Sequence, residues 1–270
     1  MTPVEITRGD GPVVLGLPHT GTHVPGAMMA DLNARGRRLD DTDWHIERLY
    51  DGLLPGATSV RATFHRYVID ANRDPSGASL YPGQNTTGLV PLTNFDGNAI
   101  WDRPPDEAAI DARRRSFHAP YHAALAAELE RVRARHGVAI LYDCHSIRSE
   151  IPFLFDGTLP DFSIGTNLGE TCDPAIEHAV HRICAKAEGY TSVLNGRFKG
   201  GWTTRHYGRP QKGLHAIQME LAQSSYLGAE AAPWPYEARK ADRLRAHLAR
   251  ILTTLSDLAP SLPKHSGDRA

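Results

Sequence analysis

Residues 138–148 read VAILYDCHSIR, and this stretch decides the fold class. Its first five positions form a nearly continuous apolar run, which is typical of a central strand in a parallel sheet. The polar residues Asp143, Cys144 and His145 follow directly. Ligands of open α/β sheets bind beyond the carboxyl ends of the strands. The stretch therefore predicts a buried strand that leads into a functional site.

Further strands and helices alternate along the chain. Short runs rich in β-branched residues predict strands, and apolar spacings of three and four predict helices. The expected strands lie at 13–17, within 59–71 (one or two strands), at 191–195 and at 215–221, and the expected helices at 43–54, 105–136, 174–188 and 235–257. Residues 75–104 are dense in Gly, Pro, Asn and Thr, which predicts a long ordered loop. The alternation predicts a single α/β domain over 1–270, with helices on both faces of a mixed, mostly parallel sheet and a flexible tail over about 261–270.

The bulk composition narrows the classes of protein that the chain fits. A net charge of −1 over 270 residues, with no basic block, speaks against a nucleic-acid partner. No apolar run approaches a membrane span, and the first residues lack the pattern of a secretory signal. Three cysteines without metal-binding spacing favour the reducing cytoplasm. Fourteen histidines invite a search for a metal site, while the oligomeric state stays open.

Polar groups follow several of the expected strands. His19 comes after the strand at 13–17, Asn72 and Arg73 come after YVID, and Glu220 ends the strand at 215–221. Because the carboxyl ends of parallel strands share one edge of the sheet, these groups and His145 are expected to meet there.

A catalytic zinc ion uses three nitrogen or carboxylate ligands and a water, and His19 and His145 suit that role. The third ligand is expected from 40–47, which offers Asp40, Asp41, Asp43, His45 and Glu47. Asp143 is expected to face away from His145 and to act as an outer-sphere or structural acid. Glu220 beside the site would be a general base, although an ion pair with an arginine explains it equally well. A histidine taken alone is more often a core or surface residue.

The stretch NGRFKGGWTTRHYGRP (195–210) carries several cations among glycines and prolines. It is expected either to wrap an anionic ligand or to form a solvated surface loop. Cys144 is not expected to act as a nucleophile with His145, because neighbours in a strand point to opposite faces. The sequence contains neither a GxSxG elbow nor a phosphate-binding loop.

Ten motifs resemble those of the N-formylglutamate amidohydrolases, or deformylases, which act in histidine breakdown. They are PHTG (18–21), DTDWHIERLY (41–50), YVIDANR (67–73), YPGQNTTGLVP (81–91), PYH (120–122), DCHSIRS (143–149), LPDFSIGTN (159–167), NGRFKGG (195–201), TRHYGRP (204–210) and MELAQSSY (219–226). The resemblance covers almost the whole chain. It implies a fold similar to the zinc carboxypeptidases and aspartoacylases, with a metal at the carboxyl edge of a mixed sheet.

The resemblance also implies roles for single residues. DCHS supplies the metal ligand His145, MEL supplies the general base Glu220, and ANR places Asn72 and Arg73 in the site. The related amidases carry a glutamate soon after the first histidine, which is absent here. Asp43 is therefore expected as the acidic ligand, with Asp41 or His45 as rivals.

Taken together, these features predict hydrolysis of N-formyl-L-glutamate to formate and L-glutamate with a divalent metal, zinc by its donor set. Glu220 is expected to move the proton, and either Arg73 or a metal contact to stabilise the oxyanion. Substrate-binding residues are expected among Asn72, Arg148, Arg197, Arg205 and His206. Deacylation of another N-acyl amino acid, a peptidase-like reaction, and non-catalytic binding of an acidic amino acid remain the alternatives.

Overall fold

A seven-stranded sheet organises the computed structural model, which describes residues 2–80 and 83–264. The strands are β1 (Val4–Thr7), β2 (Val13–Leu17), β3 (Thr58–Ala62), β4 (Ala139–Ile147), β5 (Phe162–Gly165), β6 (Ser192–Leu194) and β7 (Leu214–Ala222), in the spatial order β1-β3-β2-β4-β7-β5-β6. Neighbours run parallel except at β1–β3 and β5–β7, which are antiparallel. The predicted mixed, mostly parallel sheet is confirmed.

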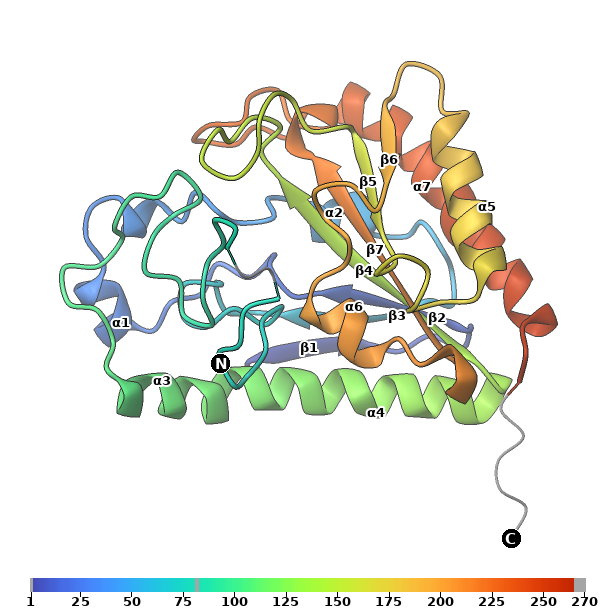
Figure 1. The fold of residues 1–270 in the computed structure, drawn as a ribbon, viewed down its shortest axis with the longest axis horizontal. Coiled ribbons are helices and arrows are strands. Elements are labelled where there is room, and N and C mark those ends of the chain that lie inside the picture. The colour runs from blue at the N-terminus through green and yellow to red at the C-terminus, as the bar shows by residue number, and fades with distance from the viewer. Residues whose placement is uncertain (1, 81–82, 265–270) are drawn as a thin grey trace, which may run out of the picture.

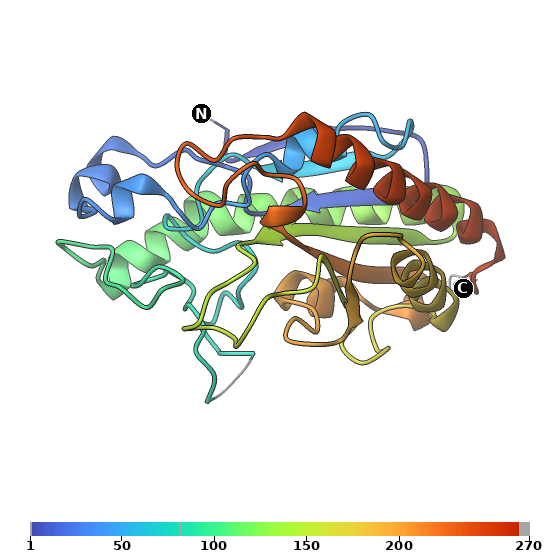
Figure 2. The same ribbon diagram turned by 90° about the horizontal axis from the view of Figure 1, so that it is seen from above.

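Helices cover both faces of the sheet (Figures 1 and 2). The helices are α1 (Gly26–Asp31), α2 (Ile46–Tyr50), α3 (Glu107–Arg113), α4 (Ala119–His136), α5 (Pro174–Ala185), α6 (Trp202–Tyr207) and α7 (Ala238–Leu258). A π-helical turn, Arg114–His118, joins α3 to α4, and 3-10 turns lie at Gly36–Arg38, Pro210–Lys212, Gln223–Ser225 and Ala259–Ser261. No helix among the described residues is long and apolar enough to traverse a bilayer.

Strand alternation explains how the core divides into two layers. Val13 and Leu15 pack in one apolar cluster with α5 and α7, whereas Val14 packs in a second cluster with α4. Successive side chains of a strand point to opposite faces, so a fully apolar strand serves both layers. The central strand β4 is buried at every position.

Three expectations about elements need correction. Only residues 59–62 of the segment 59–71 lie in a strand, β3, and residues 66–73 follow as turns, so YVID is not a strand. The loop 195–210 contains the helix α6. Leu262 is buried in the core, while residues 265–270 of the expected tail lie outside the described residues. The predicted stop at Gly137 is confirmed, because this glycine ends α4 with a φ of 79°.

Candidate metal centre and active site

The register of β4 and β7 brings two pairs of polar side chains together. Asp143 lies opposite Gln218, and His145 lies opposite Glu220. Residues two apart in a strand share a face, so all four side chains project to the same side of the sheet. The expectation that Asp143 faces away from His145 is therefore wrong. Asp143 Oδ1 lies 3.1 Å from His145 Nε2.

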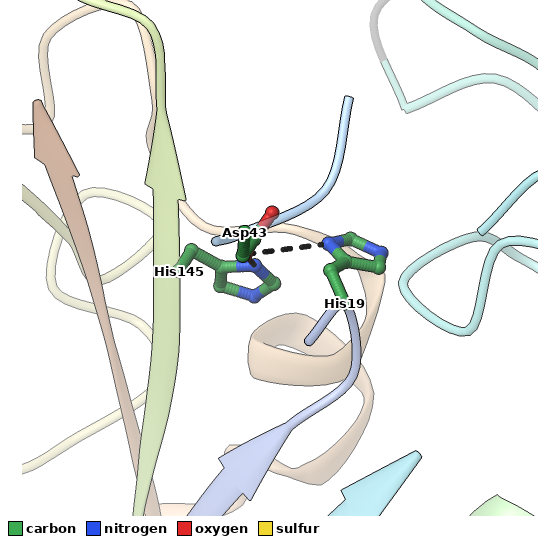
Figure 3. A group of neighbouring side chains, drawn as sticks. All are labelled: His19, Asp43 and His145. Carbon is green, nitrogen blue, oxygen red and sulfur yellow. Dashed lines mark hydrogen bonds and ion pairs between the residues drawn. The ribbon is translucent and has the colours of Figure 1, made fainter. Parts of the chain in front are cut away.

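Two loop residues complete a cluster of possible metal ligands. His19 follows β2, and Asp43 precedes α2, with the Asp43 amide donating to the carbonyl of His19 (3.1 Å). Figure 3 shows His19, Asp43 and His145 pointing toward one another, and their candidate ligand atoms all lie within 4.8 Å. All three side chains are buried. The structure thus brings together the three residues predicted as metal ligands.

Each imidazole has a carboxylate behind it. His19 Nε2 lies 2.7 Å from Asp70 Oδ1, and His145 Nε2 lies 3.1 Å from Asp143 Oδ1. An ionised carboxylate can only accept, so the Asp70 contact assigns the His19 ring proton to Nε2 and leaves its Nδ1 lone pair on the side of Asp43. His145 Nε2 also lies 3.1 Å from Asn72 Nδ2. The distances from Asp43 Oδ2 are 3.8 Å to His19 Nδ1 and 3.3 Å to His145 Nδ1. Carboxylate–histidine pairs of this kind orient metal ligands in proteins.

The donor set fits a divalent cation such as zinc. Two imidazole nitrogens and one carboxylate oxygen form a three-ligand catalytic set, and buried Asp43 Oδ1 has no hydrogen-bond partner. Burial alone would lower the pKa of His145, but the carboxylate of Asp143 holds it well above its ordinary value. The carboxylates thus make this place favourable for a positive charge, whether that charge is a proton or a metal ion.

The two rival ligands lie elsewhere. Asp41 Oδ2 accepts a hydrogen bond from the Phe95 amide (2.9 Å), and His45 Nε2 lies 2.8 Å from the carbonyl of Trp234. Neither residue belongs to the ligand cluster. Of the acids and imidazoles at 40–47, Asp43 is the one that the structure places beside His19 and His145.

Glu220 is buried beside the cluster and lines the same cavity. Gln218 Nε2 donates to Glu220 Oε2 (3.1 Å), and Gln218 Oε1 accepts from the Gly201 amide (2.6 Å), which fixes the orientation of the pair. Burial raises the pKa of the Glu220 carboxyl to about 8, although positive charge on His145 pulls it down. A carboxylate that takes up a proton near neutral pH is suited to general-base chemistry.

A cavity of about 210 Å³ opens next to the cluster. Of the predicted substrate-binding residues, Asn72 and Arg197 line it, and so does Arg73. Three others do not line it: Arg148 donates to Asp96 Oδ1 (2.8 Å), Arg205 donates to the carbonyl of Gly200 (2.9 Å), and His206 stacks on Trp202 at 4.3 Å between ring centroids. The cavity therefore gathers part of the predicted set.

Arg66 is a residue of the site that sequence reasoning missed. Its guanidinium is buried, lines the cavity, and places Nη1 3.4 Å from His19 Nδ1 and 3.9 Å from Asp43 Oδ1. Nη2 pairs with Asp70 Oδ2 at 2.5 Å. The signal was available, because an arginine within the mostly apolar run TFHRYVIDA is costly to bury unless it has a partner or a function.

A mixed α/β sheet with polar groups gathered beside a cavity at one edge defines the chain as an α/β protein with a candidate active site. A profile of the N-formylglutamate amidohydrolase family matches residues 11–227. The chain is 47% identical over 255 residues to an N-formylglutamate deformylase of Pseudomonas aeruginosa, covering 93% of this chain and 95% of that protein. It is 44% identical over 251 residues to an N-formylglutamate deformylase of Pseudomonas putida, covering 92% and 93%. The chain belongs to the N-formylglutamate amidohydrolase family.

Solved structures agree with this assignment. An N-formylglutamate amidohydrolase from Ralstonia eutropha JMP134 superposes with a TM-score of 0.80 at 27% identity, covering 97% of this chain and 99% of that one. A protein from Agrobacterium tumefaciens superposes with a TM-score of 0.71 at 18% identity, covering 94% and 96%, and shares the fold. The family resemblance predicted from sequence motifs is confirmed.

Proposed function

We propose that the protein hydrolyses N-formyl-L-glutamate to formate and L-glutamate in a metal-dependent reaction. Family membership supports the substrate, since relatives at 44–47% identity carry the name N-formylglutamate deformylase. The buried cluster of His19, Asp43 and His145 beside Glu220 is the observation that supports the chemistry. The cluster offers three ligands for a cation, and Glu220 adds a carboxylate beside them that is not itself a proposed ligand.

His19, Asp43 and His145 would hold the metal, for which we propose zinc. A divalent cation at such ligands supplies Lewis-acid charge and lowers the pKa of a water. Glu220 accepts the proton of the attacking water and delivers it to the amide nitrogen, so that the C–N bond breaks and L-glutamate leaves as the amine. Gln218 keeps the Glu220 carboxylate directed into the cavity through its 3.1 Å hydrogen bond.

We propose that Arg66 stabilises the oxyanion that forms on the formyl oxygen when water adds to the formyl carbon. The sequence predicts Arg73 for this role, but Arg66 is the guanidinium with contacts to both His19 and Asp43. Preorganised positive charge in a buried site is worth several kcal/mol to such a transition state. Arg73 and Arg197 line the cavity and are proposed to bind the two substrate carboxylates, with Asn72 assisting.

The wider assignments follow the same hypothesis. We propose that residues 1–270 act as one catalytic domain, in the cytoplasm, at the last step of a histidine degradation route. Three cysteines that are buried and unpaired are compatible with a reducing compartment. An apolar pocket that excludes one extra methyl gains only about 1–3 kcal/mol, so slow turnover of N-acetylglutamate is expected as well.

Formate release before and after chelation tests the metal-dependent mechanism. Chelated protein should lose activity and regain it with added Zn²⁺, and full turnover with no bound metal would refute the metal role. Glu220→Gln should lower kcat by about 10²–10⁴-fold. Glu130→Gln is the matched control, because Glu130 pairs with Arg133 on the surface of α4. Binding of N-formylglutamate without formate release would favour the non-catalytic binder instead.

A further inference from the structure

The π-helical turn Arg114–His118 turns two histidines toward the active site. His118 ends this turn, and His122 follows four residues later in α4, so both imidazoles lie on one face of the helix. Both side chains are buried. A single π turn inside an α-helix often accompanies a functional site, because it changes the angle at which later side chains leave the helix.

Each imidazole binds the backbone of the segment Ala71–Arg73. His118 Nε2 lies 3.0 Å from the carbonyl oxygen of Arg73, and His122 Nε2 lies 2.8 Å from that of Ala71. A carbonyl oxygen can only accept, so Nε2 carries the proton in both rings. Burial lowers the pKa of His118, and burial with nearby His118 lowers that of His122 to about 3. Both rings are therefore neutral donors near pH 7.

Helix α6 contacts both this segment and the two imidazoles. The Thr203 amide donates to Asn72 Oδ1 (2.9 Å), and the Trp202 ring packs against both imidazoles, with ring centroids 5.7 Å from His118 and 4.7 Å from His122. Ala71–Arg73 itself belongs to no helix or strand. Its conformation therefore depends on hydrogen bonds from its neighbours rather than on a regular ladder.

We propose that His118 and His122 are positioning residues that hold Asn72 and Arg73 in the geometry that binds the dicarboxylate substrate. The two histidines bind the carbonyl oxygens of the residues on either side of Asn72, whose Nδ2 lies 3.1 Å from His145 Nε2. They thereby fix the backbone from which the Arg73 side chain reaches the cavity. This inference rests on the proposed function. It assigns a role to the motif PYH (120–122) and to the preceding π turn, which the chemistry alone leaves unexplained.

Substrate preference distinguishes positioning from a general loss of folding. The measured quantity is kcat/KM for N-formyl-L-glutamate divided by that for N-formyl-L-glutamine and for N-formyl-L-isoglutamine, each of which lacks one carboxylate. This ratio does not depend on the folded fraction. One of the two analogues lacks the carboxylate that Arg73 binds, and His118→Phe should lower the ratio of N-formyl-L-glutamate to that analogue about tenfold. His118→Gln keeps an N–H donor and should restore most of the preference.

Two comparisons complete the experiment. The Phe117 ring lies in the same π turn and packs edge-on against Phe64, so Phe117→Leu should leave the ratio unchanged. In an Arg73→Gln background, His118→Phe should change the ratio less than it does in the wild-type background, because only the contribution of Asn72 remains. An equal loss on all three substrates, or an undiminished change in that background, would overturn the proposal. His122→Phe is the second variant should His118→Phe fail to fold.

A crystal structure of the His118→Phe protein gives a readout that does not depend on turnover. Arg73 should leave its hydrogen bonds with Thr87, which are 2.9 Å long to both the carbonyl and Oγ1. An Arg73 that keeps these bonds would overturn the positioning role, even for a protein that releases no formate. Wild-type protein without deformylase activity would contradict the proposed function, and the position of Arg73 would then decide this inference separately.

Discussion

Replacing His122 by glutamine should weaken the dependence of stability on pH between pH 7 and pH 5. The pKa of this imidazole is 6.5 in the reference state but falls to about 3 in the folded protein, chiefly through burial. At pH 5 the unfolded chain therefore carries a proton on His122, and the folded protein does not. Protons bound by the unfolded state alone favour unfolding.

The magnitude follows from the two pKa values. A depressed pKa in the folded state means that the stabilisation is complete above pH 6.5 and is lost progressively as the pH falls toward 3. Each pH unit below 6.5 costs about 1.4 kcal/mol, so the change from pH 7 to pH 5 lowers the free energy of unfolding by about 2 kcal/mol. Glutamine at this position removes that contribution and leaves those of all other groups in place.

Urea unfolding at pH 7 and pH 5, at equal metal content, measures the effect. The decrease in the free energy of unfolding on going to pH 5 should be about 2 kcal/mol larger for the wild type than for His122→Gln. Phe117→Leu in the adjacent π turn changes packing without removing a titratable group, so it is the control and should retain the wild-type decrease. An equal decrease in wild type and His122→Gln would refute the claim that His122 stays neutral in the folded protein.

Two further predictions concern the cavity wall. In Gly201→Ala, the new Cβ would lie 2.3 Å from Asn72 Nδ2 and 2.6 Å from Oδ1, so displacement of Asn72 should lower kcat/KM at least about tenfold. Gly26→Ala, with nothing within 4 Å, is the control, and equal activity of the two variants would contradict the packing argument. Arg197→Gln should raise KM about tenfold, whereas Arg205→Gln should change it less than about twofold, because only Arg197 of this pair lines the cavity. A larger effect at Arg205 would reverse the assignment.

The sheet and its helices could be predicted from the sequence because their patterns are local. The apolar runs at 13–17 and 138–142 are short and bounded by glycine, proline or polar residues, which favours buried strands, and the spacing of α7 shows one apolar stripe. The strand expected over 63–71 is wrong, because these residues are buried and rich in β-formers yet lie in turns and loops. Burial by tertiary contacts, rather than strand pairing, explains that composition.

The candidate site was predictable where residues stand at strand ends. His145 and Glu220 project to one side because β4 and β7 are in register, and His19 follows the adjacent strand β2. The sequence could not tell which arginines line the cavity. Arg148 donates to Asp96 and Arg205 to the carbonyl of Gly200 instead. Long side chains choose partners by three-dimensional proximity, which a linear pattern does not contain.

The nine paired positions between β4 and β7 hold one part of the site rigidly, whereas the loops that form the rest of the cavity wall can change independently of it. The proposed metal ligand His145 and the proposed base Glu220 lie on neighbouring strands, and a shift of either strand by one residue would turn its side chain to the opposite, apolar face of the sheet. Much of the remaining cavity wall comes from Asp74–Leu80, Asn85–Leu89, Arg197 and Phe198, which belong to no regular element. Substitutions in these loops can therefore change which acyl amino acid is cleaved while the residues on β4 and β7 stay the same.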